Sequence, residues 1–185
     1  MTEVAVARVR LLVLPYASLQ GESLVQLLVN ELGSARWSRF AAAVAFAKHS
    51  GNYVEFLDAL RKFSEAGNTV ELTFGGNTFG AEAAGSEYEA IESLLRELQK
   101  TTDTKIFLYR EAARTFHPKI YLFDNNKDLT ALLVVGSSNW TDGGLRDNVE
   151  ANVVIDLDLT KKDQKTLHQQ VRSYFEDFWQ EKQGP

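Results

Sequence analysis

The residues of this chain whose types and spacing could do chemistry lie in one stretch, RTFHPKIYLFDNNKDLTALLVVGSSNWTDGG. His117 and Lys119 stand two residues apart at the start of a predicted strand, KIYLF, so strand alternation places both side chains on one face. After a turn at NNKD, the return strand ends in GSSN, where Ser137 and Asn139 again share a face. The hairpin therefore gathers an imidazole, an ammonium, a hydroxyl and an amide.

These groups suit a reaction at phosphorus. An imidazole near a cation is a poised nucleophile or proton carrier at neutral pH. Lys119 supplies a positive charge, and Ser137 and Asn139 supply neutral donors, as the oxygens of a five-coordinate phosphate transition state require. On the next predicted strand, VEANVVI, Glu150 could accept the proton of the second imidazole nitrogen of His117 and fix its tautomer.

Four further positions are candidate contacts for a substrate. Gly136, next to Ser137, is small enough to let a ligand approach the backbone. Arg114 is a basic residue beside the motif and a candidate contact for a phosphate backbone. The predicted strand VELTF runs into GGNTFG, where backbone N–H groups of Gly76 and Asn77 could cradle a phosphate. A plain turn explains that loop equally well.

Simpler interpretations exist for most of these residues. His117 and Lys119 could be solvated groups on an exposed strand edge, and Glu150 could face solvent opposite a row of core valines. GSxN stands in register with HxK, and this favours a catalytic role for these residues over the simpler interpretations. Asp124 and Ser138 fit structural roles better.

The chain has three histidines and no cysteine, which argues against a multi-histidine metal centre and excludes thiolate ligands. His49 and His168 are expected to be packed or solvated. The sequence around His49, AFAKHSG, has no lysine two residues further on and no GSxN, so it is not a second copy of the motif.

The spacing resembles the HxK(x)4D…GSxN motif of the phospholipase D superfamily, whose aspartate is usually a structural residue away from the reacting phosphorus. The matching residues are His117, Lys119, Asp124, Gly136, Ser137 and Asn139. The resemblance continues through NWTDGGLRDNVEANVVID and is closest to the single-motif, metal-independent nucleases of the restriction endonuclease type. The turn NNKD is longer than usual, which should only lengthen the hairpin.

The resemblance implies a two-step reaction without a metal or other cofactor. In that superfamily the motif histidine attacks phosphorus to form a covalent phosphohistidine, and a second histidine protonates the leaving oxygen and then activates water. Carried over residue by residue, His117 is the nucleophile, Lys119 and Asn139 bind phosphate oxygens, and Ser137 assists. Glu150 matches a carboxylate one strand further on.

The expected function is therefore that of an endonuclease that hydrolyses DNA. Because the chemistry needs two histidines and the chain has one motif, a homodimer would share an active site at its two-fold interface. Related restriction enzymes carry a separate DNA-recognition domain, and such a domain or a helicase domain is a candidate partner. Two alternatives stay open: a hydrolase of phospholipids or other phosphodiesters, and a non-catalytic module for nucleic-acid binding or dimerisation within a larger protein.

The composition is in the globular range, with 185 residues of which 44% are hydrophobic and 24% charged. The net charge of −5 gives no overall attraction to nucleic acid, so DNA binding would need a local basic patch. No run of 18 apolar residues is present, so no membrane partner is expected. The N-terminal apolar run lacks a basic flank and predicts a strand rather than a signal peptide, which makes the cytoplasm the expected location.

Helical and extended patterns alternate along the chain and then give way to hairpin strands. Apolar spacing predicts helices within 22–32, 54–63, 91–98 and 160–182, with Asn52 and Ser86 as caps of the second and third. Strands are predicted at 39–47, 70–74, 105–109, 119–123, 129–135 and 149–155. Parallel βαβ units followed by antiparallel strands imply one α/β domain over residues 1–185, with a mixed parallel and antiparallel sheet and helices on both faces.

Overall fold

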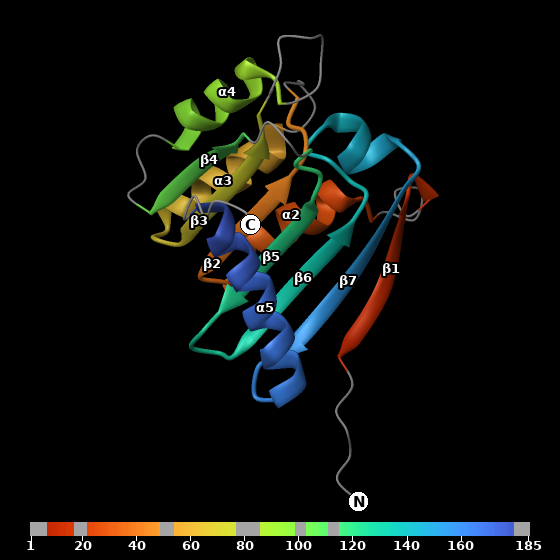
Figure 1. Ribbon diagram of the computed structural model, residues 1–185, viewed down its shortest axis with the longest axis vertical. Coiled ribbons are helices and arrows are strands. Elements are labelled where there is room, and N and C mark those ends of the chain that lie inside the picture. Colours follow the sequence, from red (N-terminus) through yellow and green to blue (C-terminus); the bar gives the residue numbers. More distant parts are fainter. Residues whose placement is uncertain are drawn as a thin grey trace, which may run out of the picture.

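The computed structural model describes residues 7–16, 22–48, 54–76, 86–98, 103–110 and 115–179 (Figure 1). The strands are β1 (Arg8–Leu14), β2 (Arg39–Val44), β3 (Thr69–Gly75), β4 (Thr104–Tyr109), β5 (Lys119–Asn125), β6 (Thr130–Gly136) and β7 (Glu150–Asp158). The helices are α2 (Leu24–Gly33), α3 (Val54–Glu65), α4 (Tyr88–Leu98) and α5 (Lys162–Trp179), with a short π-helical turn, η2 (Gly143–Asp147).

All seven strands belong to one sheet, in the order β1-β7-β6-β5-β2-β3-β4. β2, β3 and β4 are parallel to one another, because helices connect them, whereas β1, β5, β6 and β7 form antiparallel pairs. The predicted mixed sheet is confirmed. The N-terminal apolar run forms β1, which pairs with β7.

Helices cover both faces of the sheet, as expected (Figure 1). α2, α3 and α4 bury their apolar sides in one core with the inner residues of β2, β3 and β5, among them Phe40, Phe74 and Phe123. On the other face α5 buries Phe175 against a smaller core that includes Leu122 and Leu133. Burial of these two apolar layers supplies the main driving force for the fold.

The helix ends agree with the predictions in part. α3 ends at Glu65, and Gly67 follows with a φ of +84°, a left-handed conformation that favours glycine. The predicted cap at Ser86 is wrong: its Oγ accepts a hydrogen bond from the Ala47 amide at 2.9 Å, and so ties the start of α4 to the segment after β2. Asn52, the other predicted cap, lies outside the described residues.

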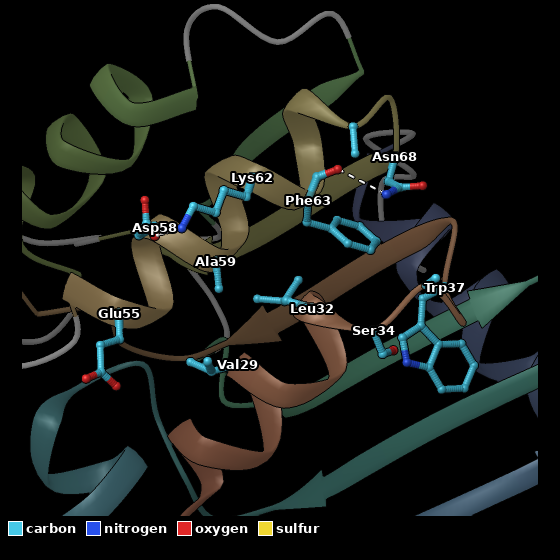
Figure 2. Close-up of a pocket in the computed structure, with 13 residues that line it drawn as sticks. Val29, Leu32, Ser34, Trp37, Glu55, Asp58, Ala59, Lys62, Phe63 and Asn68 are labelled. Atoms are coloured by element: carbon cyan, nitrogen blue, oxygen red, sulfur yellow. Dashed lines mark hydrogen bonds and ion pairs between the residues drawn. The ribbon is translucent and has the colours of Figure 1, made fainter.

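A pocket of about 730 Å³ lies between α2 and α3 (Figure 2). Leu32, Ala59 and Phe63 line it with apolar surface, and Trp37 and Asn68 lie at the starts of β2 and β3. It contains none of the motif residues. Because the motif residues lie at the C-terminal ends of β2 and β3, the pocket is at the opposite end of the sheet.

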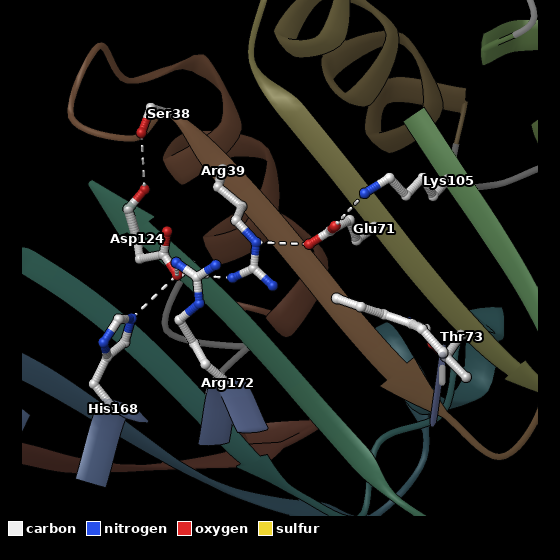
Figure 3. A network of polar contacts seen from close by, with 9 residues as sticks. Ser38, Arg39, Glu71, Thr73, Lys105, Asp124, His168 and Arg172 are labelled. Carbon is white, nitrogen blue, oxygen red and sulfur yellow. Dashed lines mark hydrogen bonds and ion pairs between the residues drawn. The ribbon is translucent and has the colours of Figure 1, made fainter. Parts of the chain in front are cut away.

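A buried network of charged side chains ties α5 to the sheet (Figure 3). Asp124, near the end of β5, accepts a hydrogen bond from Nη1 of Arg39 at 2.7 Å and lies 3.1 Å from Nε2 of His168 on α5. Nε of Arg39 donates to Glu71 on β3 at 2.7 Å. Burial alone would raise the pKa of Asp124, but the hydrogen bond with His168 and the charges of Arg39 and Arg172 hold it below its usual value. Asp124 and His168 are therefore packed structural residues, as expected.

Candidate active site

The first two motif side chains lie together at one end of β5. Lys119 is the first residue of β5 and pairs with Val44, the last residue of β2. Its Nζ lies 2.9 Å from Nδ1 and 3.1 Å from Nε2 of the His117 ring, and donates to the His117 carbonyl at 3.2 Å. His117 is exposed and Lys119 is buried. The site thus holds an accessible imidazole on a buried cation, as strand alternation predicts.

Two neighbours set the electrostatics of this pair. Burial lowers the pKa of Lys119, and the negative charge of Glu150 opposes that shift. The ring of Phe46 lies 5.9 Å from the Lys119 Nζ and packs edge-on against the His117 ring, with the ring centroids 6.0 Å apart. The sequence placed Phe46 only within a buried strand, so its contact with both motif residues was not predicted.

Ser137 and Glu150 form the second part of the site, at the end of β6 and the start of β7. The Ser137 hydroxyl donates to the Glu150 carboxylate, and its oxygen accepts from the Ala151 amide at 3.0 Å. Glu150 also accepts from Nδ2 of Asn148 at 3.4 Å. In the described residues Ser137 and Asn148 are therefore the hydrogen-bond partners of Glu150, whereas the expected partner was the second nitrogen of His117.

Asn139 is fixed by the end of the neighbouring strand β2. Its Oδ1 accepts from the Phe46 amide at 3.2 Å, and the next residue, Trp140, donates to the Phe46 carbonyl at 3.0 Å. Because Oδ1 is engaged, the group that Asn139 can offer to a phosphate is its amide NH2 donor. The phosphate contact expected of Asn139 would use this NH2 group.

A buried polar layer supports the turn between Ser137 and Asn139. The Tyr121 hydroxyl donates to the Ser138 carbonyl at 3.0 Å, and Nδ2 of Asn152 donates to Oγ of Ser138 at 2.9 Å. Burial, with the nearby charge of Glu150, raises the pKa of Tyr121, so that its hydroxyl stays protonated. Sequence reasoning missed this layer, although Tyr121 stands two residues after Lys119 and so shares its face.

Both glycines proposed as substrate contacts are engaged by other parts of the chain. A Cβ on Gly136 would lie 2.7 Å from Cα of Asn152, so the space beside Gly136 is filled by β7 and not left for a ligand. The amide of Gly76 donates to the Tyr109 carbonyl at 2.8 Å, which engages the N–H expected to cradle a phosphate. Arg114 and Asn77 lie outside the described residues.

The described part of the chain contains no cluster of three or more histidine and acidic side chains that could hold a metal ion. None of the helices within the described ranges is long and apolar enough to cross a membrane.

Solved structures with the same fold are known. NucT from Helicobacter pylori has a TM-score of 0.64 and 19% identity, over 95% of this chain and 97% of that one. Nuc from Salmonella typhimurium, a phospholipase D family member, has a TM-score of 0.62 and 18% identity, over 95% of each chain. A polyphosphate kinase from Porphyromonas gingivalis matches 80% of this chain but 23% of its own, with a TM-score of 0.56 and 14% identity. No curated protein matches the sequence.

The mixed sheet, with an imidazole, an ammonium and small polar groups at one end, has the fold of Nuc, the phospholipase D family member. The sequence itself matches the family described as cardiolipin synthase, PLD-like domain, over residues 28–179. The chain belongs to this PLD-like family of the phospholipase D superfamily.

Proposed function

We propose that this chain is a metal-independent endonuclease, which cuts DNA through a covalent intermediate on His117. The observation that carries the proposal is the contact of the exposed His117 ring with the buried Lys119 ammonium, with Nζ 2.9 Å from Nδ1. Ser137 and Glu150 are bonded to each other at the same end of the sheet. A nucleophile, a fixed cation and neutral donors therefore border one accessible surface.

The first step forms a bond between a ring nitrogen of His117 and phosphorus and breaks the bond from phosphorus to the leaving oxygen. Lys119, Asn139 and Ser137 stabilise the charge on the other phosphate oxygens. The leaving oxygen takes a proton from a second imidazolium. That imidazole, now neutral, then takes a proton from water, the water oxygen attacks phosphorus, and the N–P bond breaks to restore His117.

The second imidazole comes from a second copy of the chain. Within the described residues the other histidine is His168, which is buried against Asp124 at the far end of β5. We therefore propose a homodimer with two His117 side chains facing each other across a two-fold axis. One serves as nucleophile and the other as proton carrier.

In this proposal residues 1–185 form one catalytic domain. Arg114 and Asn77 remain candidate DNA contacts, and a separate DNA-recognition or helicase domain remains a candidate partner. The chain is similar to Nuc, a phospholipase D family member, and to the cardiolipin synthase family, so phospholipid head groups are the competing substrate class.

The test is cleavage of plasmid and single-stranded DNA in excess EDTA by the wild type and two variants. His117→Ala should lower the cleavage rate by on the order of 10³-fold or more, because it removes the nucleophile. Lys127→Ala is the matched control, since Lys127 is exposed in the turn at the opposite end of the same hairpin. Alkaline quenching followed by mass spectrometry should find a nucleotide adduct on the peptide that contains His117.

Equal cleavage by His117→Ala and the wild type would contradict the proposal. Loss of cleavage in EDTA that returns with a divalent ion would contradict its metal-independent form. If no DNA is cut but His117-dependent hydrolysis of phosphatidyl head groups is seen, the phospholipid alternative holds. Binding of DNA without any hydrolysis would favour the non-catalytic module.

A further inference from the structure

The end of the sheet that carries the motif continues beyond β5, through β2 and β3, to the edge strand β4 (Figure 1). β2 ends beside the start of β5, where the Ala45 amide donates to the Pro118 carbonyl at 2.9 Å. β2, β3 and β4 are parallel, so all three end on this side. Arg110 directly follows β4 and is exposed. It therefore lies at the same end of the sheet as His117, three strands away.

Lys119 and Arg110 also project from the same face of the sheet. Lys119 stands two residues before Tyr121, which is buried in the core that α2, α3 and α4 cover. Arg110 stands four residues after Ile106, which packs against that core as well. Because side chains alternate along a strand, both cations belong to this face. An ammonium and a guanidinium therefore border one surface at the motif end of the sheet.

The surface between the motif and β4 is formed by two glycines at the end of β3, Gly75 and Gly76. A Cβ on Gly75 would lie 2.5 Å from the Ala45 carbonyl oxygen and 3.5 Å from Cδ1 of Phe116, the residue before His117. Glycine in a strand often marks such a close approach of neighbouring backbones. β3 therefore places no side chain of its own between the motif and β4.

The Arg110 side chain extends across this glycine surface. A Cβ on Gly76 would lie 2.8 Å from Cγ and 3.1 Å from Nε of Arg110, so the arginine reaches from β4 over the end of β3, toward the motif. None of the described carboxylates pairs with Arg110, whereas Arg96 on α4 pairs with Glu92 at 3.6 Å. The planar guanidinium of Arg110 is therefore free to bind a phosphate, for which its paired N–H donors are well suited.

The spacing of the two cations indicates what kind of substrate could contact both. Adjacent strands are about 4.8 Å apart, so three strand spacings put Arg110 on the order of 10–14 Å from Lys119. This distance exceeds the size of one phosphodiester group and suits a second phosphate further along the same substrate. A polynucleotide strand carries such a phosphate, whereas a head group with a single phosphodiester does not.

We propose that Arg110 binds a second phosphate of the substrate strand, on the β4 side of the scissile phosphate, and thereby selects polynucleotides over small phosphodiesters. This inference rests on the proposed function, since it assigns the scissile phosphate to His117 and Lys119. The strand passes over the glycine surface at the end of β3, where no side chain other than that of Arg110 meets it in the described residues. Arg110 acts on binding and specificity and takes no part in bond breaking at His117.

The test compares the cleavage of DNA with the hydrolysis of bis(4-nitrophenyl) phosphate, a diester with a single phosphate. Arg110→Ala should raise KM for DNA about 10-fold with little change in kcat, because the lost contact is remote from the reacting bond. The slope of log KM against log salt concentration should fall by about 1, as expected for one phosphate contact. The loss in kcat/KM should be several-fold larger for DNA than for the small diester.

Arg96→Ala is the matched control, because it removes the same charge from an exposed position on α4. It should change neither the KM for DNA nor the salt slope. Circular dichroism melting checks that both variants are folded, so that a loss of structure is not mistaken for a loss of binding.

Gly76→Ala provides a second way to disturb the same contact. The added Cβ would displace the Arg110 side chain, so this variant should also raise KM for DNA. The double variant Gly76→Ala/Arg110→Ala should bind DNA no more weakly than Arg110→Ala alone, because both changes remove one contact. Additive losses would contradict the position of the Arg110 contact across Gly76.

The outcomes separate this inference from the proposed function. An Arg110→Ala variant with the wild-type KM and salt slope, or with equal losses on DNA and on the small diester, would overturn the inference. Hydrolysis of the small diester by a wild type that neither cuts nor binds DNA would overturn both.

If the wild type hydrolyses neither substrate, the nuclease proposal fails and a binding measurement decides on Arg110. Fluorescence anisotropy with a labelled oligothymidylate should then show weaker binding by Arg110→Ala than by Arg96→Ala. That result would keep the Arg110 contact in a non-catalytic module, and equal affinities of the two variants would refute it.

Discussion

The Lys119 ammonium is an unusual charge, since it is buried and in contact with an imidazole that faces solvent. Burial lowers its pKa, and the charge of Glu150 partly restores it. The charged form of Lys119 therefore lowers the free energy of unfolding at pH values below its folded pKa. This destabilisation disappears above the ordinary lysine pKa of about 10.4. A cation kept in such a place despite its cost is typical of a functional site.

The first prediction at the scale of single residues concerns pH. Glu150→Gln removes the charge that raises the pKa of Lys119, so Lys119 should lose its proton at lower pH. The alkaline limb of the kcat/KM profile should therefore move to lower pH in Glu150→Gln. The control is Glu92→Gln, an exposed carboxylate on α4, which should leave the limb in place. An unmoved limb in Glu150→Gln would show that Lys119 does not govern it.

A second prediction concerns the support beneath the motif turn. Tyr121→Phe removes the donor to the Ser138 carbonyl, which should cost about 1 kcal/mol of the free energy of unfolding. It should also lower kcat about 10-fold with little change in KM, because Ser137 and Asn139 flank Ser138 and lose their alignment. The measurement combines urea unfolding with steady-state kinetics.

The matched control for Tyr121→Phe is Val134→Ala. Val134 is the buried cross-strand partner of Tyr121 on β6 and has an apolar side chain. It should lose stability without a comparable fall in kcat. Equal falls in kcat for the two variants would assign Tyr121 a role in packing alone.

At the scale of elements, the Asp124 network fixes α5 on the sheet. Asp124→Asn should lower the free energy of unfolding by about 1.5–3 kcal/mol, since it removes one of the two carboxylates that pair with the buried Arg39 charge. Because the pKa of Asp124 is lowered by folding, this contribution is present above about pH 4 and is lost as pH falls through the folded pKa. Urea unfolding at pH 7 and pH 3.5 should show a smaller difference from the wild type at the lower pH.

Glu176→Gln serves as the control for Asp124→Asn, since Glu176 is an exposed carboxylate on the same helix. It should change stability little at either pH. If Asp124→Asn differs from the wild type by the same amount at both pH values, the charge of Asp124 is not what stabilises the network.

The sequence patterns predicted most of the elements because each pattern is local. Alternation and apolar runs identified the strands from β2 to β7, and the two-residue spacing of His117 and Lys119 predicted their contact. The end of α3 at Gly67 follows from glycine geometry alone. Where the relevant residues are near in sequence, elementary rules suffice.

The contacts that sequence reasoning missed join residues far apart in the chain. Arg39 is a charge at the start of an otherwise apolar strand, which signals a buried partner without identifying it. Its partner, Asp124, follows from the position of β5 beside β2, which no local pattern specifies. The bond between Glu150 and Ser137 depends on the side-chain geometry at two strand ends, so alternation could not choose it over His117.

At the scale of the whole molecule, a shared active site predicts how cleavage activity depends on the proportion of wild-type and mutant chains. When wild type and His117→Ala are mixed in equal amounts and allowed to exchange, about one quarter of the dimers carry two His117 residues. Cleavage should therefore fall to about one quarter of the wild-type value at the same total protein concentration. Cleavage assays over a series of mixing ratios measure this dependence.

A linear dependence on the wild-type fraction would contradict the shared site, because it would mean that each copy works alone. Mixtures of the wild type with Lys127→Ala provide the control, and their activity should not change with the ratio. The series also detects slow exchange, since the activity then falls with incubation time.

The pairing of β1 with β7 has a consequence during protein synthesis. Arg8 is the cross-strand partner of Asp156, so the first described strand has no neighbour until β7 has left the ribosome. Such non-local pairing slows folding and leaves apolar strands open while translation proceeds. Glu150, which bonds to Ser137, begins the same late strand. A nascent chain therefore cannot complete its candidate active site until β7 has been made.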